Sequence, residues 1–378
     1  MTPEYEVATV LTQNQEYLTS KVFNPWQRRS LFALSRCRTA ALGGHIDKCD
    51  HTPCGALHLS YNSCRNRHCP KCQGHKRQEW IAKREEDLLP VGYYHVVFTL
   101  PSELNTLALY NPKLVYNTLF KTAWAVIKGF GENPDYLGAL TGMICILHTW
   151  GQNMSLHPHL HCIVPSGGVD KKGHWKWVKK KDKYLYPVKE MSTVFRAKYV
   201  AELRRKGIAD QELFDKLFTK NWVVYAKRPF KHASHVVEYL GRYTHKIAIS
   251  NHRIKSITSG EVVFSAKNYK KDGKKEYLSL NPKVFIRRFA MHILPKGFVR
   301  IRHYGFLSST GKRLYLKNIQ EQLGKPKLKV KPETMHLVCP KCKQGRLVTV
   351  AVFDARGPPR YWLKRLKNPE YHDFKIKR

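Results

Sequence analysis

The order of hydrophobic and polar positions along the chain predicts strands in its middle part. Tyr93–Leu100 is rich in β-branched and aromatic residues and ends at Pro101, which is typical of a strand. Two further apolar segments, 143–150 and 159–164, predict strands joined by a polar connection. Shorter strands are expected at 222–226, 246–250 and 262–267.

Helical patterns are interspersed with these strands. Their expected ranges are 75–89, which stops at Pro90, 113–128, which ends at Gly129, 192–205 and 210–218, which Gly207 separates, and about 235–244. Because the strands alternate irregularly with the helices, the pattern favours an α+β fold over a regular parallel α/β sheet.

The charge of the chain indicates its class of partner. Its 378 residues include 67 Lys and Arg against 28 Asp and Glu, a formal net charge of +39. So large an imbalance suits a polyanion, and nucleic acid is the first candidate because each neutralised phosphate releases counterions. An anionic membrane surface or ribosomal RNA would fit the charge equally well.

The cations are unevenly distributed, which predicts a division of the chain. Residues 91–165 hold three Lys against three acidic residues, whereas residues 251–378 hold 31 Lys and Arg against 8 acidic residues, with aromatic residues among them. We expect an N-terminal zinc-binding, DNA-recognition domain (1–88), a catalytic domain (89–310) and a basic C-terminal region (311–378).

No signal segment opens the chain, and no apolar run is long enough to cross a bilayer. We therefore expect a cytoplasmic, nucleoid-associated protein with no membrane partner. Its oligomeric state is left open. Ten cysteines in a reducing compartment indicate metal binding or burial rather than disulfides.

A block rich in Cys and His, residues 37–72, predicts a structural zinc site. Cys69-Pro70-Lys71-Cys72 forms a CxxC knuckle, and two pairs of thiolates suit tetrahedral zinc. The ligand set expected is Cys49, Cys54, Cys69 and Cys72, with Cys64, His68 and His45 as alternates. A second knuckle, Cys339 and Cys342, is a candidate for a second zinc ion, with His336 or another distant residue as a partner, or it is a remnant. Cys145 and Cys162 lie in apolar strands and are expected to pack in the core.

The segment around His159 and His161 predicts half of a second metal site. Alternate residues of a strand share a face, so these two imidazoles point one way while Leu160 and Cys162 point into the core. Gln152, just past the preceding apolar run, is the expected third ligand, and His157 ranks lower because Pro158 interrupts the strand.

Two tyrosines, Tyr239 and Tyr243, stand four positions apart in a helical pattern and so share one helix face. By itself this spacing is more typical of core packing. Together with the histidine pair and the positive charge, it favours a pair of nucleophiles.

Several motifs resemble those of IS91-type transposases. They are YNSCRNRHCPKC at 61–72, FTLP at 98–101, HPHLHCIVPSGG at 157–168, YLGRYTHKIAISNHR at 239–253 and LPKGFVRIRHYGFL at 294–307. The resemblance implies an HUH endonuclease core, in which an antiparallel sheet with helices on its faces holds a metal ion on a central strand. The spacing of Cys49 and Cys54 is longer than the CxxC usual in this family.

By the same resemblance, His159 and His161 are the paired ligands, Gln152 is the polar ligand, and Tyr239 and Tyr243 are the nucleophiles. Lys246 lies where related initiators carry a lysine after the tyrosine. The implied activity is a metal-dependent (Mg²⁺ or Mn²⁺) tyrosine endonuclease and strand transferase. It would act on single-stranded or locally melted DNA through a 5′-phosphotyrosine, in rolling-circle transposition.

Cations in and beside these motifs are the expected contacts to DNA. They are Arg65, Arg67, Arg242, Arg287, Arg288, Lys296, Arg300 and Arg302. Two alternatives remain: a zinc-dependent DNA-binding regulatory protein without catalysis, and a plasmid replication initiator or relaxase that uses the same chemistry.

Overall fold

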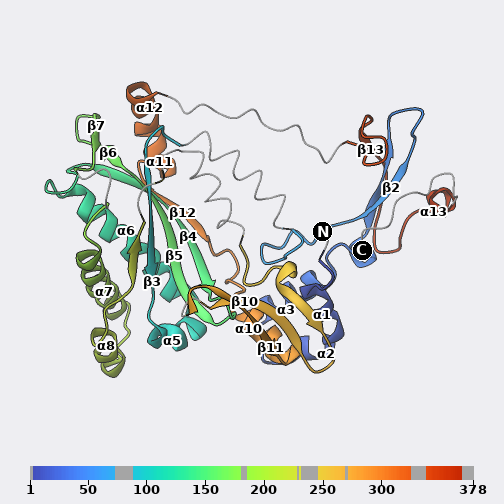
Figure 1. The fold of residues 1–378 in the computed structure, drawn as a ribbon, viewed down its shortest axis with the longest axis horizontal. Helices are drawn as coiled ribbons and strands as arrows, with labels where there is room; N and C mark the ends of the chain where they lie inside the picture. Colours follow the sequence, from blue (N-terminus) through green and yellow to red (C-terminus); the bar gives the residue numbers. More distant parts are fainter. Residues whose placement is uncertain are drawn as a thin grey trace.

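The computed structural model describes residues 3–72, 88–179, 185–227, 230, 246–268, 271–324 and 338–367. The described residues form one large antiparallel sheet, two smaller sheets and the helices packed against them (Figure 1). Among these residues, no helix is both long and apolar enough to cross a membrane.

The large sheet has the strand order β7-β6-β4-β5-β3-β8, with β12 pairing with β4, and every neighbouring pair is antiparallel. Its strands are β3 (Tyr93–Thr99), β4 (Leu140–Trp150), β5 (Leu156–Pro165), β6 (Gly167–Val169), β7 (Trp175–Trp177), β8 (Val224–Ala226) and β12 (Ile301–Gly305). The longest strands, β4 and β5, lie side by side in the middle of the sheet.

Alternation along these strands gives the large sheet two different faces. One face carries Phe98, Leu147 and Leu160 into the main core, where α6 (Pro112–Glu132) and α7 (Val188–Arg205) cover it. The opposite face carries the histidines of β4 and β5, next to a smaller core around Ile144, Ile163 and Phe306. Polar side chains are therefore gathered on the face opposite the two long helices.

A second core joins the two halves of the chain. Helices α1 (Val7–Gln13), α2 (Gln15–Leu18) and α3 (Pro25–Ser35) pack with α10 (Pro282–Met291) and with the sheet β11-β10-β9. That sheet comprises β9 (Ile254–Ile257), β10 (Val262–Asn268) and β11 (Lys274–Leu280). Trp26 Nε1 donates to the Leu294 carbonyl at 3.0 Å, and Gln27 Nε2 donates to the Ala290 carbonyl at 3.0 Å. This core therefore extends across residue 88, where the sequence suggested a domain boundary.

A third, small sheet brings together segments from opposite ends of the chain. Its order is β13-β1-β2, with β1 (Gly44–Cys49) between β2 (Leu57–Tyr61) and β13 (Leu347–Phe353). Helix α13 (Arg360–Lys367) contributes Trp362 and Leu366 to its core. In Figure 1 this sheet lies away from the large sheet, on the far side of the N-terminal helices.

The remaining described helices are short: η1 (Ala40–Leu42), η2 (Ser102–Leu104), α5 (Asn105–Tyr110), α8 (Gln211–Phe218), η3 (Asn251–Arg253), α11 (Ser309–Gly311), η5 (Lys312–Leu316) and α12 (Lys317–Leu323).

The α+β class with antiparallel sheets is confirmed, and the strands predicted at 93–100, 143–150 and 159–164 correspond to β3, β4 and β5. No strand forms at 246–250, so that prediction is wrong. Helix α6 continues through Gly129 to Glu132, because the tertiary contacts of the main core outweigh the weak helix propensity of one glycine. The helices predicted at 75–89 and 235–244 lie wholly or mostly outside the described residues.

Candidate metal centres

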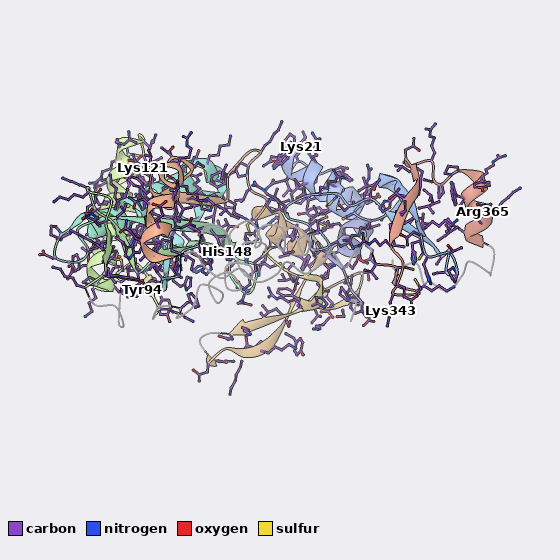
Figure 2. All side chains as sticks on the ribbon, turned by 90° about the horizontal axis from the view of Figure 1, so that it is seen from above. Lys21, Tyr94, Lys121, His148, Lys343 and Arg365 are labelled. Carbon is purple, nitrogen blue, oxygen red and sulfur yellow. The ribbon has the colours of Figure 1, made fainter. Side chains whose placement is uncertain are left out.

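Three histidines meet on the face of the large sheet opposite α6 and α7. His159 and His161 alternate along β5, and His148 lies directly opposite His159 on β4. The ring of His148 is centred 4.6 Å from that of His161 and 5.5 Å from that of His159. Their candidate ligand atoms all lie within 4.8 Å of one another, which is close enough for one ion to contact all three. Figure 2 places His148 at the inner end of the large sheet, toward the middle of the molecule.

Hydrogen bonds orient two of these rings. The Nδ1 atom of His159 donates to the His157 carbonyl at 2.7 Å, so the Nε2 atom of the neutral ring keeps its lone pair. The Nδ1 atom of His161 lies 2.9 Å from Nε2 of His95, which is buried on the neighbouring strand β3. Fixing one nitrogen by a hydrogen bond and leaving the other free is the usual arrangement of a ligating histidine.

Burial keeps the imidazoles neutral. It lowers the pKa of His159 to about 4 and that of His95 to about 3, and it lowers the pKa of His161 well below the ordinary value. The Lys246 ammonium adds to the lowering for both His159 and His161, so this lysine lies close to the cluster. Neutral imidazole is the form that binds metal ions, and these side chains therefore have it at pH 7.

The third residue beside the histidine pair is His148, whereas the sequence predicts Gln152 there. Gln152 lies in the turn after β4, where its backbone carbonyl accepts a hydrogen bond from Arg253. The residue that β4 places beside His159 and His161 is His148. The sequence carried a signal for this, because His148 follows Ile144 and Ile146 at a spacing of two and so shares their face.

Lys246 is held in place by a buried arginine. Arg300 donates from Nη1 to the Lys246 carbonyl at 3.1 Å, and its own carbonyl accepts from Leu147 N on β4 at 3.0 Å. Tyr239, Arg242 and Tyr243 lie outside the described residues.

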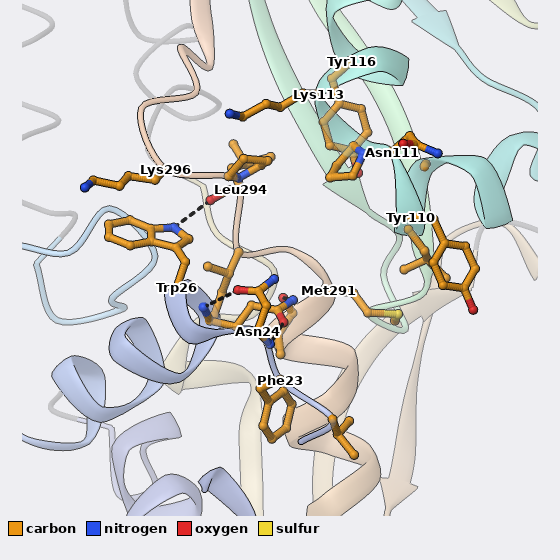
Figure 3. Close-up of a pocket in the computed structure, with 18 of the residues that line it drawn as sticks. Phe23, Asn24, Trp26, Tyr110, Asn111, Lys113, Tyr116, Met291, Leu294 and Lys296 are labelled. Atoms are coloured by element: carbon orange, nitrogen blue, oxygen red, sulfur yellow. Dashed lines mark hydrogen bonds between the residues drawn. The ribbon is translucent and has the colours of Figure 1, made fainter. Parts of the chain in front are cut away.

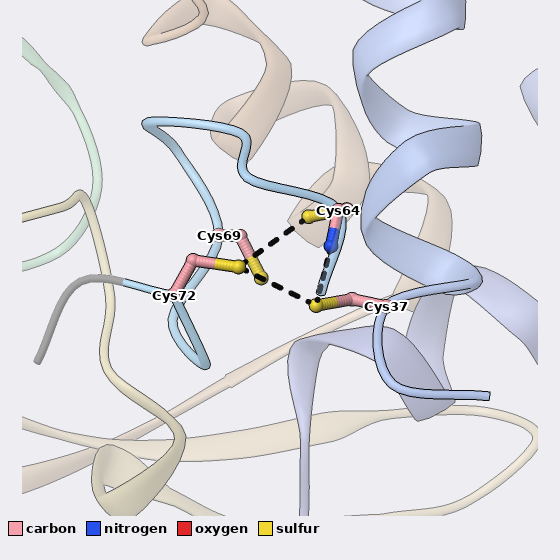
Figure 4. Close-up of side chains that lie close together, drawn as sticks. All are labelled: Cys37, Cys64, Cys69 and Cys72. Carbon is pink, nitrogen blue, oxygen red and sulfur yellow. Dashed lines mark hydrogen bonds between the residues drawn. The ribbon is translucent and has the colours of Figure 1, made fainter. Parts of the chain in front are cut away.

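A first cysteine cluster comprises Cys37, Cys64, Cys69 and Cys72, whose sulfur atoms point toward one another (Figure 4). The Sγ atom of Cys72 lies 3.5 Å from that of Cys37 and 3.7 Å from that of Cys64. Four thiolates at about 2.3 Å from a tetrahedral zinc ion stand about 3.8 Å apart, so this donor set fits zinc. Hydrogen bonds among the four thiols lower the pKa values of Cys37 and Cys72 and raise those of Cys64 and Cys69.

A second cluster comprises Cys49, Cys54, Cys339 and Cys342, all within 4.8 Å of one another. The pairs expected to share one zinc ion, Cys49 with Cys54 and Cys69 with Cys72, are therefore divided between two clusters. The reason is the path of the chain, because β13 pairs with β1 and brings the C-terminal knuckle to Cys49. Sequence reasoning did not rank Cys37 as a ligand, since it has no CxxC partner, and its position in the Cys- and His-rich block was the only signal.

The alternate zinc ligands take different positions. Cys64 belongs to the first cluster, whereas His45 faces Asp47 at 3.4 Å. His68 is buried, and within the described part of the chain its Nε2 atom has no hydrogen-bond partner. Cys145 and Cys162 pack in the main core with their sulfur atoms 3.1 Å apart.

Several cations expected to contact DNA make contacts within the protein. Arg67 donates to the carbonyls of Phe298 and Pro295, and Arg302 stacks over Phe120 with its guanidinium carbon 4.1 Å from the ring centre. Arg300 is buried, and Arg288 donates to the Asn153 carbonyl at 3.0 Å. Arg65 is an exposed loop residue with a positive φ of 51°.

Arg287 and Lys296 line a groove between the N-terminal helices and the start of α6 (Figure 3). The groove has a volume of about 1120 Å³, and Trp26 and the exposed Tyr110 contribute aromatic surface to it. Its described lining residues include the cations Lys21, Lys113, Arg287 and Lys296 and no carboxylate.

Two family models match the chain in order. The family described as "Transposase zinc-binding domain" matches residues 9–100, and the family described as "Putative transposase" matches residues 142–313. The first range contains all of the first cysteine cluster, and the second contains the three clustered histidines.

Two relatives carry transposase names. The chain is 38% identical over 369 residues to "Putative transposase y4qJ" of Sinorhizobium fredii, a match that covers 89% of this chain and 92% of that protein. It is 28% identical over 310 residues to "Transposase for insertion sequence element IS801" of Pseudomonas savastanoi pv. phaseolicola, covering 76% of this chain and 72% of that protein. No solved structure gives a significant match. The chain therefore belongs to the IS91-type transposases and contains the zinc-binding domain of that family.

Proposed function

We propose that this transposase nicks and rejoins single-stranded DNA at the ends of an insertion sequence, through a 5′-phosphotyrosine intermediate, and so drives rolling-circle transposition. The observation that carries the proposal is the cluster of His148, His159 and His161 on one face of an antiparallel sheet. In this proposal the large sheet is an HUH-type endonuclease core.

The cluster fits a divalent cation because the imidazoles of His159 and His161 are neutral and the three rings converge from two adjacent strands. His148, His159 and His161 would hold Mn²⁺ or Mg²⁺, with Gln152 as the candidate for an additional oxygen ligand. Nitrogen donors favour Mn²⁺ over Mg²⁺, which prefers oxygen. A bound ion would withdraw electron density from the scissile phosphate and orient it.

Either Tyr243 or Tyr239 would be the nucleophile. The phenol oxygen loses its proton and forms a bond to phosphorus, while the bond from phosphorus to the 3′ oxygen breaks and that oxygen takes up a proton. The products are a 5′-phosphotyrosine and a free 3′-hydroxyl. Attack by a 3′-hydroxyl on this ester reverses the step and rejoins DNA without an external energy source.

Lys246 is close to the histidine cluster in space and close to Tyr243 in the sequence. It lies close enough to His159 and His161 to affect both pKa values, and Arg300 fixes its backbone. Tyr243 precedes Lys246 by three residues, so the covalent chain limits their Cα atoms to about 11 Å apart. This connection supports a role for the tyrosine beside the cluster, and Lys246 is the candidate to stabilise charge on the phosphate.

The groove beside Trp26 is the candidate path for the DNA strand. Aromatic side chains stack on unpaired bases, and Lys113 and Lys296 would neutralise phosphates along such a path. A duplex pairs and stacks its bases and cannot use these aromatic contacts, which supports a single-stranded substrate.

A covalent-adduct assay tests the chemistry. Purified protein, Mn²⁺ and 3′-labelled single-stranded DNA carrying an element end should give a protein–DNA adduct that survives boiling in detergent and is prevented by EDTA. Replacing both nucleophiles (Tyr239→Phe with Tyr243→Phe) should abolish the adduct and leave DNA binding intact. Tyr277→Phe is the matched control, because Tyr277 is exposed on β11.

If the double variant still forms the adduct, the tyrosine assignment is wrong. If the wild-type protein binds a correct end sequence and never forms an adduct, the chain is a DNA-binding regulator and the proposed chemistry fails.

A further inference from the structure

The second cysteine cluster lies only partly within the segment that matches the zinc-binding domain. Cys49 and Cys54 fall inside residues 9–100, whereas the other two members come from the C-terminal part of the chain. Cys49 ends β1 and Cys54 lies in the turn that follows, whereas Cys339 and Cys342 lie in the turn before β13. About 290 residues of sequence separate the two pairs, and the pairing of β13 with β1 brings them together.

Two tight turns present the four sulfur atoms. In the first, Cys54 N donates to the His51 carbonyl at 2.9 Å. In the second, Lys343 N donates to the Cys339 carbonyl at 2.9 Å, and Gly345 N donates to Cys342 Sγ at 3.3 Å. Each turn therefore holds its two sulfur atoms on the same side, as a zinc knuckle does.

The sulfur positions fit one tetrahedral ion. Cys49 Sγ lies 3.6 Å from Cys342 Sγ, and Cys54 Sγ lies 3.9 Å from Cys339 Sγ. A zinc ion with bonds of about 2.3 Å requires a separation of about 3.8 Å. Nε2 of His58 lies 3.8 Å from Cys339 Sγ, where it can support the sulfur atom from outside the ligand set.

Gly345 permits the close approach of the two turns. A Cβ atom at this position would overlap Cys49 Sγ and would lie 2.6 Å from Cβ of His51. Because Gly345 has no side chain, the two turns can approach closely enough for their four cysteines to bind one ion.

The surrounding sheet has little apolar material to stabilise it. Its core contains the buried side chains of Ile46, Leu57 and Phe353, and the region around the cysteines adds Ala56. Three short strands with so small a core are marginal without additional stabilisation, and a structural metal ion supplies it.

We propose that Cys49, Cys54, Cys339 and Cys342 bind a second zinc ion, which fastens the C-terminal strand β13 to the N-terminal strand β1. Four thiolates complete the coordination sphere, so this ion is structural and not catalytic. The ion also attaches a strongly basic segment to strand β1. Residues 338–367 hold eight Lys and Arg against one Asp.

Zinc stoichiometry of the full-length protein tests the grouping. The wild-type protein should contain two zinc ions per chain by elemental analysis. Cys339→Ser with Cys342→Ser should contain one, and so should Cys49→Ser with Cys54→Ser. The variant with all four substitutions should also contain one, because both pairs contribute to the same ion.

Two comparisons complete this test. Cys37→Ser with Cys64→Ser should remove the other ion, and adding Cys339→Ser with Cys342→Ser should leave none. The proposal is overturned if Cys339→Ser with Cys342→Ser keeps two ions, or if the fourfold variant at 49, 54, 339 and 342 keeps none.

A measurement on the unmodified chain avoids variants that fail to fold. After chelation of zinc, oxidation with diamide should convert pairs of thiols to disulfides that join Cys49 or Cys54 to Cys339 or Cys342, as seen in peptide mass spectra. Disulfides from Cys49 or Cys54 to Cys69 or Cys72 alone would refute the proposed site.

Discussion

At the scale of single residues, the histidine cluster depends on a side chain that is not one of its members. His95 on β3 contacts Nδ1 of His161, and if His161 binds the ion through Nε2, its Nδ1–H must donate to Nε2 of His95. His95 is thus a positioning residue that would set the tautomer and orientation of a metal ligand.

Removing this contact should weaken metal binding. We expect His95→Ala to raise the dissociation constant for Mn²⁺ by about 10- to 100-fold, because the His161 ring loses the acceptor that orients it. His95→Gln should recover part of the affinity, since its side-chain oxygen can accept the same hydrogen bond. Calorimetric titration with Mn²⁺ measures the effect.

His174→Ala is the control, because His174 is largely exposed. A purely structural role for His95 predicts lower thermal stability with unchanged Mn²⁺ affinity, and this pattern would contradict the positioning role.

At the scale of secondary-structure elements, an ion-pair network fastens the two helices that cover the main core. Glu202 on α7 accepts a hydrogen bond from Lys121 on α6 at 2.8 Å, and it also pairs with Arg205 of its own helix. These hydrogen bonds, that from Arg205 first, lower the pKa of Glu202 to about 2.

The network predicts a pH-dependent contribution to stability. Because the pKa of Glu202 is lower in the folded chain than its ordinary 4.5, its stabilising effect is complete above about pH 4.5 and is lost as the pH falls toward 2. Glu202→Gln should therefore lower Tm at pH 7 and make a smaller difference at pH 3. The effect should be modest, since both cations are more than half exposed.

Differential scanning calorimetry of the two proteins at both pH values checks this expectation. Glu212→Gln provides the comparison, because the Glu212 pair with Lys216 lies in solvent. An equal Tm difference at pH 7 and pH 3 would show that Glu202 acts by packing alone.

Some of these elements and their pairings could be predicted from the sequence, and others could not. The strands β3 and β5 were predictable because their period of two is local, and so was the common face of His159 and His161. The pairing of β1 with β13 was not, since nothing within either segment identifies its partner. For the same reason the cysteine pairs could be recognised from their spacing, whereas their division between two clusters could not. His148 was missed because its role depends on its register with His159.

At the scale of the whole molecule, the groove lies where the N-terminal helices meet α10 and the start of α6 (Figure 3). Residues from three distant parts of the chain contribute its cations, among them Lys21, Lys113 and Lys296. A strand bound there would contact the N-terminal core and the nuclease core together.

If the groove binds single-stranded DNA, Lys113→Ala with Lys296→Ala should weaken binding at low salt. The slope of log affinity against log salt concentration should become shallower by about 1.4, which corresponds to two phosphate contacts on a single strand. Fluorescence anisotropy with a labelled oligonucleotide over a range of salt concentrations measures both quantities.

The control for this variant is Lys189→Ala with Lys198→Ala, which removes two exposed cations from α7. Equal losses in both variants would mean that net charge, rather than the groove, determines affinity.

The position of β1 between β2 and β13 has a consequence for the order of biosynthesis. Synthesis runs from the N-terminus, so β1 and β2 leave the ribosome long before Leu347–Phe353 has been translated. Until then one edge of β1 lacks the strand with which it pairs in the complete fold, and Cys49 and Cys54 lack the two other thiols of their cluster. A chain that terminates before β13 cannot form the sheet β13-β1-β2, so only translation products that include β13 contain this sheet.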